Sequence, residues 1–130
     1  MTANSIRTKE QRAAEAAYCC VAERKRAGKS SFDEYITFAL DFPALIHSCG
    51  LVQALSFAQA KGKTDYIADI SDVFHKLNDE KVDLLEKSRS APLLEYTRIT
   101  RRALQAATWL KRYCQANDTR QTDEGQAAEK

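Results

Sequence analysis

Apolar residues recur at three- and four-residue intervals along most of the chain, and no segment alternates apolar and polar residues as a half-buried strand would. Only four Gly and two Pro interrupt this pattern, so helices are expected throughout. The sequence predicts an all-α fold: a single compact bundle of about five to six helices, with a central apolar helix and a disordered C-terminal tail.

Three helices are expected in the first half of the chain. The first covers residues 8–27 and ends at Gly28, because glycine readily adopts the backbone conformation that follows a helix. Ser31, with Glu34 three residues later, forms a capping-box pattern that predicts a short second helix. Pro43 suits the first turn of a helix, so a third helix is predicted to begin there.

The third helix is expected at the centre of the bundle. Residues 43–60 are apolar on almost every side, a pattern typical of a helix that is buried all round. Gly50 lies inside this segment, where it either interrupts the helix or lets a neighbouring element approach closely.

Three further helical segments are expected after the turn at residues 61–63. The first is amphipathic and spans the sixties and seventies, and a short piece follows over residues 82–88. The last helix is long and runs from Pro92 to Ala116. The polar face of the first of these segments carries Asp65, Asp69, Asp72 and Lys76.

The last helix combines a packed side with a basic side. With about 100° between successive residues, the packed side carries Tyr96, Ile99, Ala103, Ala106, Ala107, Leu110 and Cys114. The opposite side carries Arg98, Arg101, Arg102, Gln105, Trp109 and Arg112. Arginine forks suit phosphate groups, and an indole plane suits stacking. The alternative is that other helices cover this side and the arginines pair with acidic residues; burial is favoured for Trp109 itself.

The length of 130 residues fits one domain with a single core. Residues 1–116 are expected to form this helical domain. Residues 117–130, which lack large apolar side chains, are expected to be disordered. No export signal or membrane span is recognised in the sequence, so a cytoplasmic protein is expected.

The net charge of +2 hides a segregation of charge along the chain. Residues 1–29 carry seven Lys or Arg against three Glu, and residues 91–116 carry five against one. Residues 30–90 carry six against ten acidic residues. Two basic segments therefore flank an acidic one, which predicts a face that prefers an anionic partner.

No catalytic or metal-binding constellation is apparent, so no enzyme activity, cofactor or metal is expected. The cysteines lack C-x-x-C spacing and are interpreted as small buried apolar residues; they are Cys19, Cys20, Cys49 and Cys114. Gly28-Lys29-Ser30 lacks the first glycine and the preceding strand of a phosphate-binding loop. His75 has no orienting partner and is interpreted as a surface residue.

Several fragments resemble a known family when their order and spacing are taken together. They are Ala17-Tyr18-x-x-Val21, then Pro43-Ala44-Leu45-Ile46 leading into Gly50-Leu51-x-Gln53-x-Leu55-x-Phe57 and Lys61, and finally Tyr96-x-x-Ile99-Thr100 leading to Ala103-Leu104 and Trp109-Leu110-Lys111-Arg112. This set is similar to the small helical subunit of type III-B (Cmr) CRISPR–Cas effector complexes, over residues 8–116.

The resemblance implies a non-catalytic subunit of an RNA-guided antiviral complex. In that family, several copies of the small subunit stack into a minor filament beside the backbone subunits, guide RNA and target RNA occupy the complex, and other subunits cleave. The implied partners are the backbone and large Cmr subunits, guide RNA, target RNA and further copies of this chain, with no membrane.

Candidate contacts to the RNA backbone are the basic residues of the flanking segments and of the 61–63 turn. They are Arg24, Lys25, Arg26, Lys29, Lys61, Lys63, Arg98, Arg101, Arg102, Lys111 and Arg112. The family pattern matches clearly at Lys61, Lys111 and Arg112, which could serve subunit contacts instead. Two other functions stay open: a stand-alone helical DNA-binding regulator, and an adaptor that contacts only proteins.

Overall fold

The computed structural model describes residues 7–78 and 80–120. The described residues form helices and no strand, so the all-α prediction is confirmed. The helices are α1 (Lys9–Arg26), α2 (Lys29–Cys49), α3 (Leu51–Ala60), α4 (Thr64–Leu77), α5 (Leu84–Ser90) and α6 (Leu93–Ala116).

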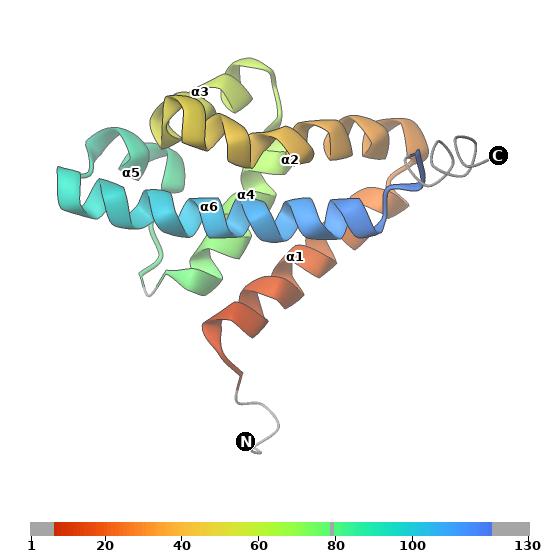
Figure 1. Cartoon of the computed structure of the whole chain (residues 1–130), viewed down its shortest axis with the longest axis horizontal. Coiled ribbons are helices and arrows are strands. Elements are labelled where there is room, and N and C mark those ends of the chain that lie inside the picture. The colour runs from red at the N-terminus through yellow and green to blue at the C-terminus, as the bar shows by residue number, and fades with distance from the viewer. Residues whose placement is uncertain (1–6, 79, 121–130) are drawn as a thin grey trace.

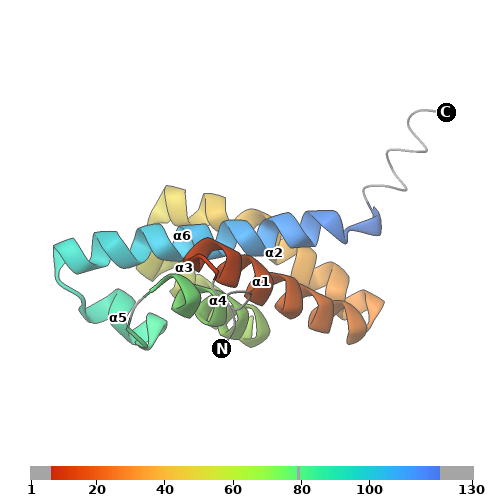
Figure 2. The same cartoon turned by 90° about the horizontal axis from the view of Figure 1, so that it is seen from below.

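The bundle is arranged around α6, which packs against α1, α2, α4 and α5. Figure 1 shows α6 crossing the molecule, with α2 running in the opposite direction beside it and α5 near its start. In the view of Figure 2, α1 and α4 lie next to one another along one side of α6. The long helix therefore contacts both the first and the middle parts of the chain.

The buried apolar side chains form one continuous core. Alanines on the buried side of α1, such as Ala13 and Ala17, are fully covered and allow close packing against α4 and α6. Larger side chains fill the space between α2 and α4, where the rings of Phe42 and Tyr66 are 4.9 Å apart between centroids. Thr8 begins α1 with a capping box in which its hydroxyl accepts from the Gln11 amide at 3.0 Å.

The prediction of two helices over residues 31–60 places the boundary at the wrong residue. α2 continues through Pro43, which lies inside the helix and is buried. Proline donates no backbone hydrogen bond and weakens a helix, but Phe42 and Ile46 on either side are also buried, and this burial offsets the loss. Ser31 is therefore inside α2, whose first residue follows Gly28.

The actual boundary is Gly50, which has φ 86° and ψ 163° and separates α2 from α3. Only glycine adopts this conformation without strain. A Cβ there would lie 3.5 Å from the Tyr96 hydroxyl, which is an ordinary contact, so the need for glycine comes from the backbone angles. That hydroxyl accepts a hydrogen bond from the Val52 amide at 3.1 Å and so caps the start of α3.

The segment over residues 43–60 is not buried on every side, as the sequence pattern predicted. Its inner side is covered, for example at Leu51 and Leu55. Its outer side is exposed at His47, Gln53 and Phe57. The end of α2 and α3 are thus amphipathic, and α6 occupies the position in the bundle that was expected for this segment.

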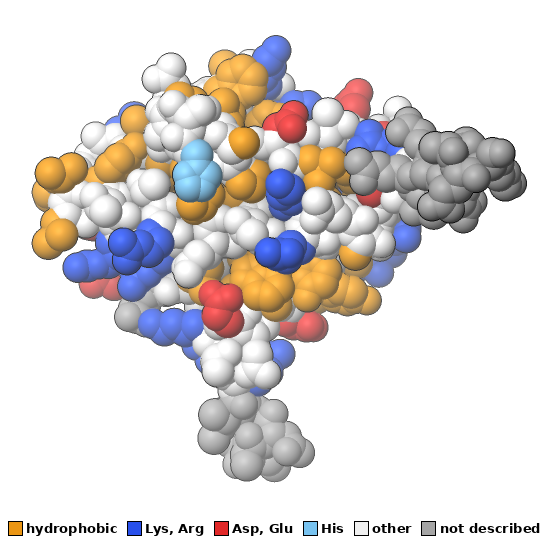
Figure 3. All heavy atoms as spheres, viewed as in Figure 1, with side chains coloured by type: hydrophobic (Ala, Val, Ile, Leu, Met, Phe, Trp, Pro, Cys, Tyr) orange, Lys and Arg blue, Asp and Glu red, His pale blue; other side chains and the backbone are white. Residues whose placement is uncertain are grey.

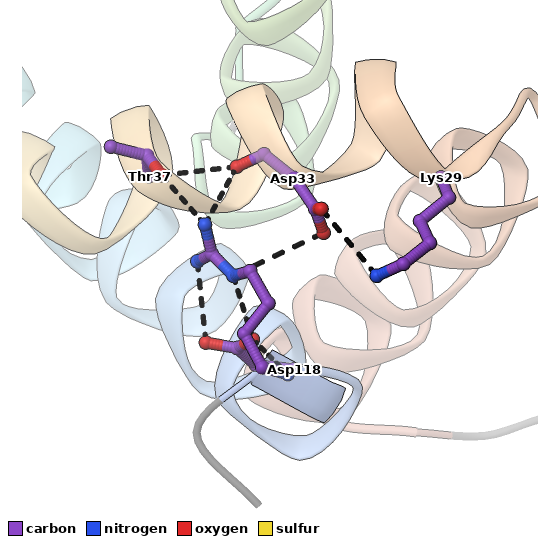
Figure 4. A network of polar contacts seen from close by, with 5 residues as sticks. Lys29, Asp33, Thr37 and Asp118 are labelled. Carbon is purple, nitrogen blue, oxygen red and sulfur yellow. Dashed lines mark hydrogen bonds and ion pairs between the residues drawn. The ribbon is translucent and has the colours of Figure 1, made fainter. Parts of the chain in front are cut away.

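The described residues continue beyond Ala116, the predicted end of the helical domain, as far as residue 120. Figure 4 shows the polar contacts that hold residues 117–120 to α2. The Arg120 guanidinium donates to Asp118 at 3.0 Å and to the Thr37 hydroxyl at 3.0 Å, and Asp118 is buried. Ion pairing and burial thus replace the missing large apolar side chains. The rest of the predicted tail lies outside the described residues.

Candidate nucleic-acid interface

The outward side of α6 carries a row of positive charge. Arg98, Arg101 and Arg112 are exposed, and Lys111 is half-buried at the edge of the row. We call these four residues the basic face of α6. Within residues 7–78 and 80–120, none of their side chains forms a hydrogen bond or an ion pair. Figure 3 shows Lys and Arg side chains spaced along the line of α6. Their guanidinium and ammonium groups are free to bind an anion.

Arg102, another candidate on α6, forms a hydrogen bond within the bundle. Its guanidinium donates to the Asn78 side chain at the end of α4, and it is half-buried. Together with Arg98 it lines an open hollow of about 540 Å³ between the end of α4 and the start of α6. Arg102 therefore contributes both to the bundle and to the charge around this hollow.

Trp109 is half-buried, whereas the sequence favoured burial. The ring stacks on Tyr113 with 6.1 Å between centroids, and the indole N–H donates to Glu10 of α1 at 3.0 Å. With Arg112 it lines a shallow hollow of about 320 Å³. An aromatic surface thus adjoins the basic face of α6.

Arg24 is hydrogen-bonded inside the bundle. Its guanidinium makes two hydrogen bonds of 2.9 Å to the carboxylate of Asp69, which also accepts from the Tyr35 hydroxyl at 2.7 Å. Asp69 is buried, although its helical spacing predicted a solvent-facing position. We call these three residues the α1–α4 seam. Arg24 is therefore engaged within the bundle.

Burial and charge shift the protonation equilibria around the seam. Burial raises the pKa of Tyr35, and the Asp69 charge raises it further. The same two causes raise the pKa of the neighbouring Cys20 thiol. The hydrogen bond to Asp69 raises the pKa of Arg24, which remains charged. The seam is thus a neutral tyrosine and an ion pair that satisfy one another, without an activated nucleophile.

The other basic candidates of the first segment have weak partners at the surface. Arg26 contacts Glu23 at 2.9 Å, and both side chains are largely exposed. Lys29 lies 3.6 Å from Asp33, and Lys25 donates to the Asn117 side chain at 3.3 Å. Exposed pairs of this kind stabilise a protein little, so these groups can exchange partners.

Two lysines near the 61–63 turn lie over aromatic rings. The Lys61 ammonium is 5.6 Å from the centroid of Phe57, and the Lys63 ammonium is 5.6 Å from that of Phe38. Both distances are within the range of cation–π attraction. Lys61 thus lies against α3 and Lys63 against α2.

The positions of the cysteines and of His75 differ in part from those predicted from the sequence. Cys114 is buried, and burial raises its pKa to about 12, but Cys19 and Cys49 are exposed. His75 is half-buried, with Nε2 2.6 Å from the Val82 carbonyl oxygen, and is not a plain surface residue. In the part of the chain that the structure describes, no group of three potential metal ligands gathers, and no helix is long and apolar enough to cross a membrane.

Sequence patterns missed the α1–α4 seam and the contacts of Asp118 and Arg120. The one signal for Asp69 is its position next to Ile70 and three residues after Tyr66, at the border of the buried face of α4. Its partners are 34 and 45 residues away. A helical pattern that compares neighbours three and four positions apart does not report such contacts.

The described residues define a small all-helical bundle with one unpaired basic helix face. The chain belongs to the family of CRISPR-associated proteins called Cas_Cmr5, whose model matches residues 9–117. It is 39% identical over 112 residues to the CRISPR system Cmr subunit Cmr5 of Thermus thermophilus, covering 85% of this chain and 96% of that protein.

A solved structure agrees with this assignment. The crystal structure of a CRISPR-associated Cmr5 family protein from Thermus thermophilus superposes with a TM-score of 0.71 and 38% sequence identity. The match covers 85% of this chain and 97% of the other. The family suggested by the sequence fragments is therefore confirmed.

Proposed function

We propose that this chain is a non-catalytic structural subunit of a type III-B (Cmr) CRISPR RNA-guided effector complex that acts in antiviral defence. In this role, copies of the chain form a minor filament beside the backbone and large subunits. The basic face of α6 contacts the sugar–phosphate backbone of guide or target RNA. Family membership over residues 9–117 supports the assignment to a Cmr complex.

The observation that carries the RNA contact is the lack of internal partners for the basic face of α6. A bundle that needed these charges for its own stability would pair them, as it pairs Arg24 with Asp69. Arg98, Arg101 and Arg112 instead project from one helix at exposed positions. Such a row can neutralise successive phosphates of one strand and release their counterions.

The contact is expected to be independent of base sequence. Guanidinium and ammonium groups bind phosphate oxygens, which are the same at every nucleotide. Lys25, Arg26, Lys29, Lys61 and Lys63 form a second set of candidates. Their surface pairs and ring contacts are weak enough to be exchanged for phosphate or for an acidic subunit surface.

The first experiment is purification of the tagged chain from its native host, with mass spectrometry of its partners and sequencing of bound RNA. Recovery of Cmr backbone subunits with short guide RNAs is the expected result. Recovery of the chain alone or with DNA would contradict the proposal and favour a DNA-binding regulator.

The RNA contact is then tested by charge reversal. The double variant Arg101→Glu/Arg112→Glu is expected to weaken retention of target RNA by the purified complex, and to make the remaining binding less dependent on salt. The matched control is Lys76→Glu/Lys81→Glu, which changes the net charge equally at exposed positions outside the candidate set.

The two variants separate RNA binding from general electrostatics. An equal loss in both would indicate a nonspecific effect of net charge. An intact complex in which Arg101→Glu/Arg112→Glu binds RNA normally would overturn the RNA contact and leave a subunit that contacts only proteins.

A further inference from the structure

An apolar groove runs along the outer surface of α2. It is open, has a volume of about 970 Å³, and extends from Asp33 to Ser48, with Phe57 of α3 at its side. Its apolar lining includes Phe38, Phe42, Leu45 and the 43% exposed Phe57. We call it the α2 groove. The exposed apolar side chains of this groove gain free energy when another molecule covers them.

The charged side chains that line the α2 groove without a partner among the described residues are acidic. Glu34 and Asp41 line it at exposed positions, and neither has a partner among the described residues. The cations at the groove already have contacts, since Lys63 lies over Phe38 and Arg120 pairs with Asp118. The groove therefore fits an apolar occupant that is flanked by positive charge.

The start of α6 in this same chain has exposed apolar side chains flanked by arginines. Leu93 and Leu94 are 81% and 75% exposed. We call this pair the leucine knob. In Figure 3, apolar side chains gather at the end of the molecule where α6 begins in Figure 1, with Lys and Arg side chains beside them. Exposed leucines on a helix start gain free energy from burial against another surface.

Exposed arginines flank the leucine knob, and Glu80 also lines the hollow that contains Leu94. Arg89 and Arg98 lie four or five residues from the leucines, at exposed positions without an acidic partner among the residues described. The acidic residue nearest in sequence, Glu95, is paired with Lys87 at 3.7 Å. The knob thus offers two apolar side chains and the Arg89 cation, and the α2 groove offers an apolar floor and two carboxylates.

We propose that the leucine knob of one copy docks in the α2 groove of a second copy. This inference rests on the proposed function in one respect, because it assigns the surfaces through which stacked copies meet. The leucines enter against Phe57 and Leu45, and Arg89 faces Glu34 and Asp41, while Arg98 stays with the basic face of α6. No residue belongs to both surfaces, so a copy that donates its knob keeps its own groove open.

A contact of this kind is heterologous and extends into a filament without closing. The knob is small, so two isolated copies associate weakly. The contact becomes effective where other subunits hold the copies side by side at high local concentration. Copy number in the assembly is thus set by the partners, and the spacing of copies by the knob and the groove.

The test places a photo-cross-linking amino acid, benzoylphenylalanine, at position 57 in the groove. Copies with heavy and light isotopes are mixed, both as the full-length isolated chain and within the complex purified from the host. We expect inter-chain adducts on residues 89–98. The variant Leu93→Asp/Leu94→Asp in the second copy is expected to reduce them by about tenfold. Benzoylphenylalanine at the exposed Tyr18 is the control and should not give these adducts.

A second pair of variants tests the groove without touching its aromatic floor. Ala44→Arg places bulk and positive charge in the groove at an exposed position, and should prevent docking of a basic knob. Ala68→Arg makes the same change at an exposed position of α4 outside the groove, and should leave docking intact.

The docking proposal is overturned if the adducts fall on other surfaces, if they persist in Leu93→Asp/Leu94→Asp, or if the two alanine variants behave alike. Recovery of a complex with guide RNA but without the knob adducts would reject docking and keep the proposed function. Recovery of the chain without Cmr partners would reject the proposed function, and adducts on residues 89–98 in the isolated chain would still support docking.

Discussion

Arg24 and Arg112 are arginines on amphipathic helices, yet the bundle uses them in opposite ways. Arg24 lies in the α1–α4 seam, where two hydrogen bonds hold it to the buried Asp69. Arg112 lies on the basic face of α6 and has no partner among the residues that the structure describes. The difference teaches that an arginine's role depends on what the fold places across from it, and not on its own helix.

The largest effect is expected from breaking the seam. Asp69→Ala removes the acceptor of Arg24 and Tyr35 at once, and should lower the free energy of unfolding by about 3 kcal/mol. Urea denaturation followed by circular dichroism measures this change. Asp65→Ala is the matched control, because Asp65 is exposed and makes a longer contact of 3.6 Å to the same guanidinium. This variant should lower the free energy of unfolding by less than about 0.5 kcal/mol. Equal losses would show that the seam is not the stabilising unit.

A smaller loss is expected from Tyr35→Phe, which removes one hydrogen bond to Asp69 and keeps the ring. The free energy of unfolding should fall by about 1.5 kcal/mol, the range for a bond to a charged group. Tyr113→Phe is the control, because the Tyr113 hydroxyl forms no hydrogen bond among the described residues; it should be nearly neutral. If Tyr35→Phe left the free energy of unfolding unchanged, the stabilisation would come from the Arg24–Asp69 pair alone.

The same tyrosine predicts a dependence on pH. In the folded protein the pKa of Tyr35 is raised, whereas in the unfolded chain a tyrosine ionises near pH 10. Above that pH the unfolded state loses the proton first, so stability falls as pH rises. Denaturation curves measured from pH 9 upward should show a steeper loss in the wild type than in Tyr35→Phe. Parallel losses would contradict this role.

Arg102→Ala is expected to lie between the two extremes. Its bond to Asn78 is partly buried, so its removal should lower the free energy of unfolding by about 1 kcal/mol. It should also weaken retention of RNA by the complex. A variant that changes only one of these properties would move Arg102 fully into the bundle or fully onto the interface.

The smallest effect on folding is expected from Arg101→Ala/Arg112→Ala on the basic face of α6. Without internal partners to lose, the double variant should unfold within about 0.5 kcal/mol of the wild type in the same urea assay. A loss comparable to that of Arg102→Ala would mean that these arginines stabilise the bundle.

The spacing of apolar residues predicted the helices of the fold, but it did not predict the boundary between α2 and α3 or the α1–α4 seam. The buried residues of α6 were all predicted on its packed side because each of them is apolar, although Tyr96, predicted with them, is only half-buried. Pro43 was misjudged because its local cost was visible and the burial of Phe42 and Ile46 around it was not. Local rules describe a helix in water, whereas a helix in a bundle is stabilised mainly by its packing.

The candidate site was also predicted only in part. Arg98, Arg101 and Arg112 were expected on an outward face and are exposed there. Arg24 was grouped with them because its partner Asp69 is 45 residues away on another helix. Whether a charge is free is a property of tertiary contacts, which periodicity along one helix does not contain.

The Tyr96 hydroxyl that caps α3 has a consequence for the order in which the chain takes shape during synthesis. The amide it satisfies belongs to Val52, made 44 residues earlier. Until α6 leaves the ribosome, the corner at Gly50 lacks this partner, and α3 begins with an open amide. The first half of the protein is thus completed by the last helix, and a chain truncated before Tyr96 would carry a frayed corner.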